Sequence, residues 1–201
     1  MIRRPPRSTL SSSSAASDVY KRQSLTNTDI DNPDVKDMVG EAQPVSYVPF
    51  RNQLFLTIAC AYAESIGAET VYHGATQVDS LAGYWDGSAE FQEHFQTLIG
   101  LNRTHQITLN CPLLSMSKQA IVEFCVGSRV DLKYTYTCYS GDELSDATTP
   151  SSSLRIKGFA DAGYIDPIKY KQDLTKYWKD NKCKPFPIDE VFSDRYGTRG
   201  P

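Results

Sequence analysis

With 201 residues, of which 40% are hydrophobic and 22% charged, the chain is long enough for one globular domain with a substantial core. Its net charge of −3 at pH 7 provides no basic footprint, so direct nucleic-acid binding is not expected. No apolar run approaches the ~18 residues that a membrane-spanning helix needs, which argues against a membrane protein.

The five cysteines are scattered along the chain and form no Cys-x-x-Cys pair. Cys60, Cys111 and Cys125 lie in apolar segments, as core thiols do. An odd number of dispersed cysteines favours a reducing, cytoplasmic compartment over a disulfide framework.

Residues 1–23 differ from the rest of the chain, because they are rich in Ser, Arg and Pro and contain a single acid, Asp18. Such a segment cannot bury enough apolar surface to fold and is predicted to be disordered. It lacks the apolar core of a signal peptide, although its composition superficially fits a transit peptide. It also closely resembles a translated sequencing-adapter sequence. We therefore expect a non-native segment, with the true protein beginning upstream.

Residues 24–45 are polar and acidic and indicate a loop or a weakly helical connector. Asn52 is a favourable N-cap for a helix that ends at Gly67. A short strand at 69–74 and a loop at 76–87 follow. The helix residues expected to face inward recur at helical spacing: Leu54, Phe55, Ile58, Ala59, Tyr62, Ala63 and Ile66.

Ser88 and Ser117 predict the caps of two more helices, separated by a strand at 105–109. A polar loop at 134–150 precedes a last helix at 151–162. The residues expected to face inward on these three helices are Phe91, Phe95, Leu98 and Ile99, then Ile121, Phe124 and Cys125, then Leu154 and Phe159. The alternation predicts an α/β fold with a parallel sheet and right-handed crossovers. Two or three strands are few for a sheet, so we expect N-terminal strands to be missing.

The predicted α/β domain extends over residues 24–165, and residues 166–201 form a lysine-rich, proline-punctuated extension. The extension carries several aromatic residues, among them Tyr170, Trp178 and Phe186. It either packs on the domain or contacts a partner.

Candidate binding residues follow the strand at 69–74 and the starts of helices. Asp79 and Asp86 lie where carboxylates can hold a ribose, a base edge or Mg²⁺, although solvated loop acids give the same pattern. Arg51 precedes a helix and can meet a phosphate or carboxylate, or form an ordinary surface salt bridge. Lys118 opposes the dipole of its helix, which indicates an anionic ligand or a tolerated exposed lysine.

The sequence offers little evidence of metal binding or nucleophilic catalysis. His73, His94 and His105 lack metal-ligand spacing and are interpreted as structural. Cys138 lies in a polar loop where a core thiol is not expected. There is no Ser/His/Asp constellation and no glycine-rich phosphate loop.

From Ser24 to about Tyr164 the chain resembles the 7-cyano-7-deazaguanine synthase (QueC) family of queuosine biosynthesis. No single motif is specific, but the series follows the family's order at nearly its spacing. The matching pieces are Leu25–Asp29, Val48–Asn52, Asp79–Ser80, Gly83–Tyr84, Asp86, Glu90–Phe91, Pro112–Leu113, Lys118, Thr137–Gly141, Leu154–Arg155 and Gly158.

The resemblance implies a Rossmann-like, adenine-nucleotide α-hydrolase-type fold and a homodimer. It implies an ATP-dependent C–N ligase, using Mg²⁺, that adenylates 7-carboxy-7-deazaguanine, admits ammonia and yields the nitrile for tRNA modification. Lys118 and Asp79 are then expected to be catalytic. The implied substrate- or nucleotide-binding residues are Arg51, Asn52, Ser80, Tyr84, Asp86 and Arg155. Of these groups, Arg51, Asn52 and Lys118 would face anions, and Asp79 and Asp86 would orient the purine-like substrate or a metal.

The sequence departs from the family pattern in three places. The family's Ser-Gly-Gly-x-Asp-Ser loop, which cradles pyrophosphate, is absent, so the chain as written is expected to be inactive in adenylation. Of the family's four zinc-binding cysteines only Cys138 remains. The other positions hold Asp146, Thr149 and Ser152, so no zinc is expected. Where the family has Pro, Cys and Arg around its Tyr-x-Asp motif, this chain has Trp85, Gly87 and Ser88.

Three functions therefore remain open. The first is an N-truncated ligase of this family. The second is a non-catalytic binding or scaffold protein that has lost the zinc site and the nucleotide loop. The third is a paralogue that acts on another carboxylate in DNA modification or defence, or another amide-forming or sulfur-inserting member of the same nucleotide-binding superfamily.

Overall fold

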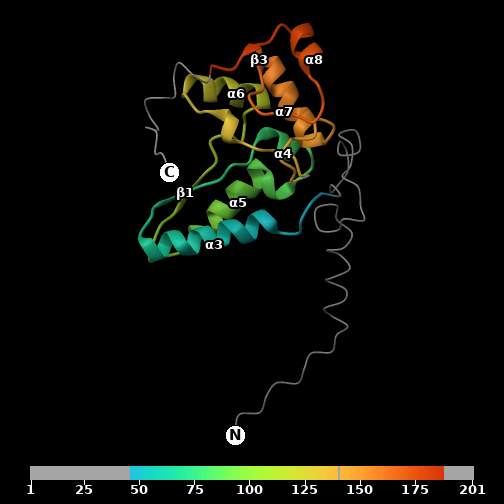
Figure 1. The fold of residues 1–201 in the computed structure, drawn as a ribbon. Helices are drawn as coiled ribbons and strands as arrows, with labels where there is room; N and C mark the ends of the chain where they lie inside the picture. Colours follow the sequence, from blue (N-terminus) through green and yellow to red (C-terminus); the bar gives the residue numbers. More distant parts are fainter. Residues whose placement is uncertain (1–45, 140, 188–201) are drawn as a thin grey trace, which may run out of the picture.

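The computed structural model describes residues 46–139 and 141–187 (Figure 1). The segments predicted for residues 1–23 and 24–45, and the end of the extension, lie outside the described residues. The elements, in chain order, are α3 (Arg51–Ile66), β1 (Thr70–Tyr72), α4 (Gln77–Leu81), η1 (Trp85–Gly87), α5 (Ala89–Ile99), β2 (Thr108–Asn110), α6 (Lys118–Gly127), η2 (Leu132–Tyr134), α7 (Pro150–Asp161), β3 (Tyr164–Ile165), α8 (Thr175–Asp180) and β4 (Lys184–Pro185).

The strands pair in parallel, as the α/β alternation predicts. β1 pairs with β2 so that Val71 lies opposite Leu109, and α5 lies on the crossover between them. β3 pairs with β4 in a second parallel pair, with Tyr164 opposite Lys184. This second pair was not predicted, because each strand has only two residues and β4 contains a proline.

One hydrophobic cluster lies between α3, α5 and the β1–β2 pair, at one end of the molecule (Figure 1). Its buried members are Leu56, Cys60, Ala63, Val71, Phe95, Ile107 and Leu109. The predicted cap of α5 is confirmed, because Ser88 Oγ accepts a hydrogen bond from the Phe91 backbone N–H at 3.0 Å.

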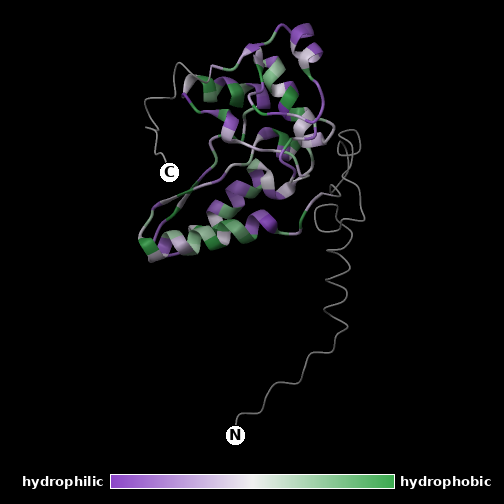
Figure 2. Cartoon of the chain, viewed as in Figure 1, coloured by the Kyte–Doolittle hydropathy of each residue, from purple (hydrophilic) through white to green (hydrophobic). Residues whose placement is uncertain are grey.

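The predicted orientation of α3 is wrong for most of its apolar residues, although Ala63 is buried as predicted. The side chains of Leu54, Phe55, Ile58, Tyr62 and Ile66 are 57–65% exposed, and Figure 2 shows apolar residues along this helix. The buried residues, Leu56, Cys60 and Ala63, also recur at helical spacing. Because α3 has two apolar faces, periodicity could not select the face that meets the strands. The predicted N-cap is also wrong, since the helix starts at Arg51 after Phe50, which has φ 53°.

The second cluster joins α6 and α7 to the C-terminal segment. Its buried members are Val122, Cys125, Leu132, Ile156, Phe159, Ala160, Trp178 and Phe186. Trp178 and Phe186 come from the predicted extension, so its described part packs on the domain. Ser117 caps α6 as predicted, but Phe124, which was expected to face inward, is half exposed. None of the helices among residues 46–139 and 141–187 is long and apolar enough to cross a membrane.

Gly158 allows α7 to approach the start of α6. A Cβ on Gly158 would lie 2.6 Å from Lys118 Cβ, which is closer than van der Waals contact allows, and 3.1 Å from its carbonyl carbon, which is a tight contact. The first turn of α6, with Lys118, is therefore held directly against the middle of α7.

We expect Gly158→Ala to lower the free energy of unfolding by about 1–3 kcal/mol, because the added methyl group forces the two helices apart. Urea titration followed by circular dichroism measures the change. Gly127→Ala in α6 is the matched control, since its Cβ would meet no atom within 4 Å. Equal stabilities of the two variants would contradict the close approach.

Candidate functional site

A cavity of about 110 Å³ lies between the two ends of the molecule. From the side of the first cluster it is lined by Ser46, Val78, Asp79, Ala82 and Tyr84, and from the side of the second by Lys118, Thr137, Tyr139, Pro150, Ser151 and Leu154. Three of the predicted site residues, Asp79, Tyr84 and Lys118, thus lie around one cavity.

Thr76 links Asp79 to Lys118 at this cavity. It follows β1 and precedes α4, and both its backbone N–H and its hydroxyl donate to Asp79 Oδ2, at 2.6 Å and 2.9 Å. Lys118 Nζ in turn donates to Thr76 Oγ1 at 3.4 Å. The carboxylate is thereby held in place, and the ammonium group, which has three donors, lies at the wall of the cavity.

Tyr84 lies on the same wall, and its hydroxyl is hydrogen-bonded to Ser46 Oγ. Burial raises the pKa of Tyr84, although the bond to Ser46 acts in the opposite direction. The phenol is therefore neutral at physiological pH and can both donate and accept a hydrogen bond.

Asp86 and Asn52 contact each other and do not line the cavity. Asp86 is 2% exposed, and its Oδ2 accepts from the Asn52 backbone N–H at 3.2 Å. The Asn52 side chain returns a bond to the Asp86 carbonyl, also at 3.2 Å. Asp86 thus supplies the anionic cap that the start of α3 lacks. Two other predicted site residues, Arg51 and the exposed Ser80, are likewise outside the cavity lining.

Trp85, at the position where the family resemblance gives proline, anchors the loop before α5 to the start of α3. Its Nε1 donates to Tyr47 Oη at 2.8 Å, and the same oxygen accepts the Phe50 backbone N–H at 2.9 Å. Its ring makes edge contacts with Phe50 and Phe91, with centroids 5.5 Å and 5.3 Å apart.

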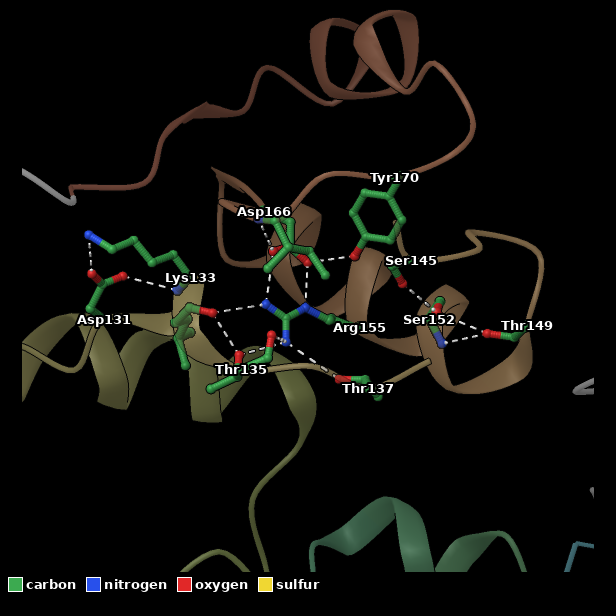
Figure 3. A network of polar contacts seen from close by, with 12 residues as sticks. Asp131, Lys133, Thr135, Thr137, Ser145, Thr149, Ser152, Arg155, Asp166 and Tyr170 are labelled. Carbon is green, nitrogen blue, oxygen red and sulfur yellow. Dashed lines mark hydrogen bonds and ion pairs between the residues drawn. The ribbon is translucent and has the colours of Figure 1, made fainter. Parts of the chain in front are cut away.

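Arg155 lies outside the cavity lining, in a buried polar network (Figure 3). Its Nε and Nη2 bind Asp166 Oδ2 and Oδ1 at 2.6 Å and 2.9 Å, a bidentate pair. The guanidinium also donates to Thr135 Oγ1 at 2.7 Å and to the Leu132 carbonyl at 3.2 Å. Burial disfavours the charged form of Arg155 and acts to lower its pKa. The hydrogen bonds to Asp166 and the charge of Asp166 outweigh this, so the pKa of Arg155 is raised.

The described residues offer no group of three or more His, Cys, Asp or Glu side chains that could hold a metal ion. Asp79 Oδ2 is occupied by Thr76, and Asp86 Oδ2 by Asn52.

Sequence reasoning did not single out Thr76, Tyr139 or Ser151 as site residues. Thr76 had a readable signal, because Thr-x-x-Asp is a helix-start pattern, and it opens the unpredicted helix α4. Tyr139 and Ser151 reach the cavity only through the path of the 134–150 loop. No local pattern encodes that path.

His73, at the end of β1, gives the fold a pH dependence. Burial lowers its pKa below the ordinary 6.5, although Asp79 and Asp86 act in the opposite direction. The unfolded chain therefore binds the proton more readily. Stability is full above pH ~6.5 and declines as the pH falls through that value towards the lower folded pKa.

We expect His73→Gln to remove part of the stability loss between pH 7.5 and pH 5. The measurement is the urea midpoint at each pH, with the exposed His94→Gln as the control. The same pH dependence in both variants would show that His73 is not the group responsible.

The sequence profile of the family described as "Queuosine biosynthesis protein QueC" matches residues 12–163. The chain is 43% identical over 134 residues to a 7-cyano-7-deazaguanine synthase of Oceanobacillus iheyensis, covering 66% of this chain and 60% of that protein. It is 37% identical over 168 residues to the synthase of Thermoplasma volcanium (81% and 68% covered) and 36% over 171 residues to that of Desulfitobacterium hafniense (83% and 70% covered). The chain thus spans 60–70% of the length of these relatives. With this match and the α/β architecture, the chain belongs to the QueC family.

Proposed function

We propose that this chain contributes the substrate pocket of an ATP-dependent ligase that converts 7-carboxy-7-deazaguanine and ammonia to 7-cyano-7-deazaguanine. The observation that carries the proposal is the Lys118–Thr76–Asp79 arrangement at a cavity that follows β1, in a member of this family. An ammonium group beside a neutral phenol and a fixed carboxylate suits a flat, polar ligand that carries its own carboxylate.

A carboxylate is a poor electrophile, so the reaction needs one of its oxygens to become a leaving group. Transfer of AMP from ATP does this, ammonia then gives the amide, and a second activation removes the amide oxygen to leave the nitrile. In this scheme Lys118 neutralises the substrate carboxylate, while Asp79 and Tyr84 orient the deazapurine ring.

A nucleotide-binding part with a Ser-Gly-Gly-x-Asp-Ser loop would complete this site. The 201 residues contain no such loop. The proposal is supported by the relatives' greater length and by the exposed apolar face of α3, which is suited to cover by further elements. In this proposal, the binding of ATP and Mg²⁺ and the formation of the homodimer require the nucleotide-binding part.

Calorimetric titration with 7-carboxy-7-deazaguanine tests the pocket. We expect binding at least about tenfold tighter than for 7-deazaguanine, which lacks the carboxylate. We expect AMP release only when the chain is joined to the loop-bearing part of a relative. Equal binding of both ligands, or none of either, would contradict the proposal.

A paralogue acting on another carboxylate is the second candidate. It is favoured by Trp85, Gly87 and Ser88, which stand where the family resemblance gives Pro, Cys and Arg. Titration with a series of heteroaromatic carboxylates distinguishes the two. A tighter ligand than 7-carboxy-7-deazaguanine would favour the paralogue.

A further inference from the structure

The four positions at which the family resemblance implies zinc ligands converge in the fold. Cys138 Sγ accepts a bond from the Asp146 backbone N–H at 3.4 Å and lies 3.7 Å from Thr149 Oγ1, which donates to it. Thr149 Oγ1 lies 2.9 Å from Ser152 Oγ. Cys138, Asp146, Thr149 and Ser152 are therefore neighbours in the fold.

The side chains at these positions do not fit zinc. A structural zinc site needs four thiolate or imidazole ligands, and here a single thiol is accompanied by two hydroxyls. The carboxylate of Asp146 is directed elsewhere, because its Oδ1 accepts from the Thr148 backbone N–H and hydroxyl and from Gln172 Nε2. The absence of zinc stays a prediction, which the chemistry of these donors supports.

A chain of hydrogen bonds links these groups instead. Ser152 is fully buried, and its hydroxyl lies 3.2 Å from Ser145 Oγ and 2.9 Å from Thr149 Oγ1 (Figure 3). Thr149 continues the chain to Cys138. The hydroxyls serve both as donors and as acceptors, so the group needs no net charge and no metal.

The C-terminal segment closes this cluster from outside. Backbone bonds connect Ser145 N to the Lys169 carbonyl at 3.2 Å and Lys171 N to the Ser145 carbonyl at 2.9 Å. The Gln172 side chain accepts from Ala147 N and donates to Asp146 Oδ1, both at 2.9 Å. The 138–149 loop is thus attached at once to the N-terminus of α7 and to residues 169–172.

We infer that this cluster, Cys138, Ser145, Thr149 and Ser152 closed by Gln172, takes over the structural task of a metal centre. Thr137, Tyr139, Pro150 and Ser151 of the cavity wall are neighbours of its members in the chain. The cluster therefore positions one wall of the pocket without metal.

The first test measures the metal content and thermal unfolding of the purified full chain. We expect less than about 0.1 zinc per chain and the same Tm with and without a chelator. Stoichiometric zinc, or a Tm that falls on chelation, would overturn the inference. Neither readout depends on ligase activity. The test therefore keeps its meaning even if the chain proves not to belong to a ligase.

The second test removes the buried hydroxyl. Ser152→Ala leaves Ser145 and Thr149 without a shared partner, and we expect Tm to fall by about 3–8 °C. Ser65→Ala, at an exposed position in α3, is the control and should leave Tm unchanged. An unchanged Tm for Ser152→Ala would overturn the inference.

The third test restores the thiols. A variant with Asp146→Cys, Thr149→Cys and Ser152→Cys is expected to bind one Co²⁺ with the visible absorption of tetrahedral thiolate coordination, whereas the parent chain shows none. A folded triple variant that binds no cobalt would contradict the convergence of the four positions. The same absorption from the parent chain would contradict its metal-free character.

Discussion

Replacement of Arg155 by alanine is expected to lower the free energy of unfolding by about 3–5 kcal/mol, because it leaves the carboxylate of Asp166 buried without its counter-charge. The Asp166 side chain is fully buried, and that of Arg155 is nearly so. The same substitution removes one hydrogen bond each from the carbonyl of Leu132 and the hydroxyl of Thr135. Arg155 thus joins α7 to two other segments, residues 132–135 and Asp166, and its contacts with both are lost together.

The measurement for Arg155 is urea unfolding followed by tryptophan fluorescence, since Trp178 lies in the adjoining cluster. Arg103→Ala, which removes an exposed guanidinium, is the matched control. The sequence-based hypothesis assigned Arg155 to substrate or nucleotide binding. An Arg155→Ala variant of parental stability and reduced ligand affinity would support that hypothesis over the structural role proposed here.

Replacement of Lys118 by alanine is expected to weaken binding of 7-carboxy-7-deazaguanine by about 10- to 100-fold, the loss of one charge-assisted hydrogen bond. Stability should change little, because the side chain is partly exposed. Affinity for 7-deazaguanine, which has no carboxylate, should stay the same.

Calorimetry with the two ligands provides the measurement for Lys118. Lys157→Ala is the control, because Lys157 is exposed and forms a surface salt bridge with Asp161, four residues further along α7. Lys118→Arg should restore part of the affinity, since the charge remains but the geometry of the donors changes. Equal losses for both ligands would place Lys118 away from the carboxylate.

The sequence predicted the α/β class and most of the elements, because caps and periodicity are local signals. Ser88 and Ser117 begin α5 and α6 as predicted. The failures have two causes, one tertiary and one local. α3 has apolar residues on two faces, and the strands selected the one with the smaller residues Cys60 and Ala63. The short helix α4 was taken for a loop, because the glycines and acids near it resemble turn residues.

The candidate site was predictable in part for similar reasons. Asp79, Tyr84 and Lys118 meet at one cavity. Asp86 and Asn52 instead bind each other. The bidentate partner of Arg155, Asp166, lies in a segment that was read as an extension. A pairing between residues distant in the sequence leaves no periodic trace, so only the folded arrangement reveals it.

The outward face of α3 has a practical consequence for the chain as a polypeptide in solution. Leucine, isoleucine and aromatic side chains along sixteen helical residues form a stripe that water wets poorly. Such a stripe promotes self-association at high concentration and capture by chaperones. Expression yield and colloidal behaviour will therefore depend on what shields this helix, whatever the intrinsic strength of the two cores.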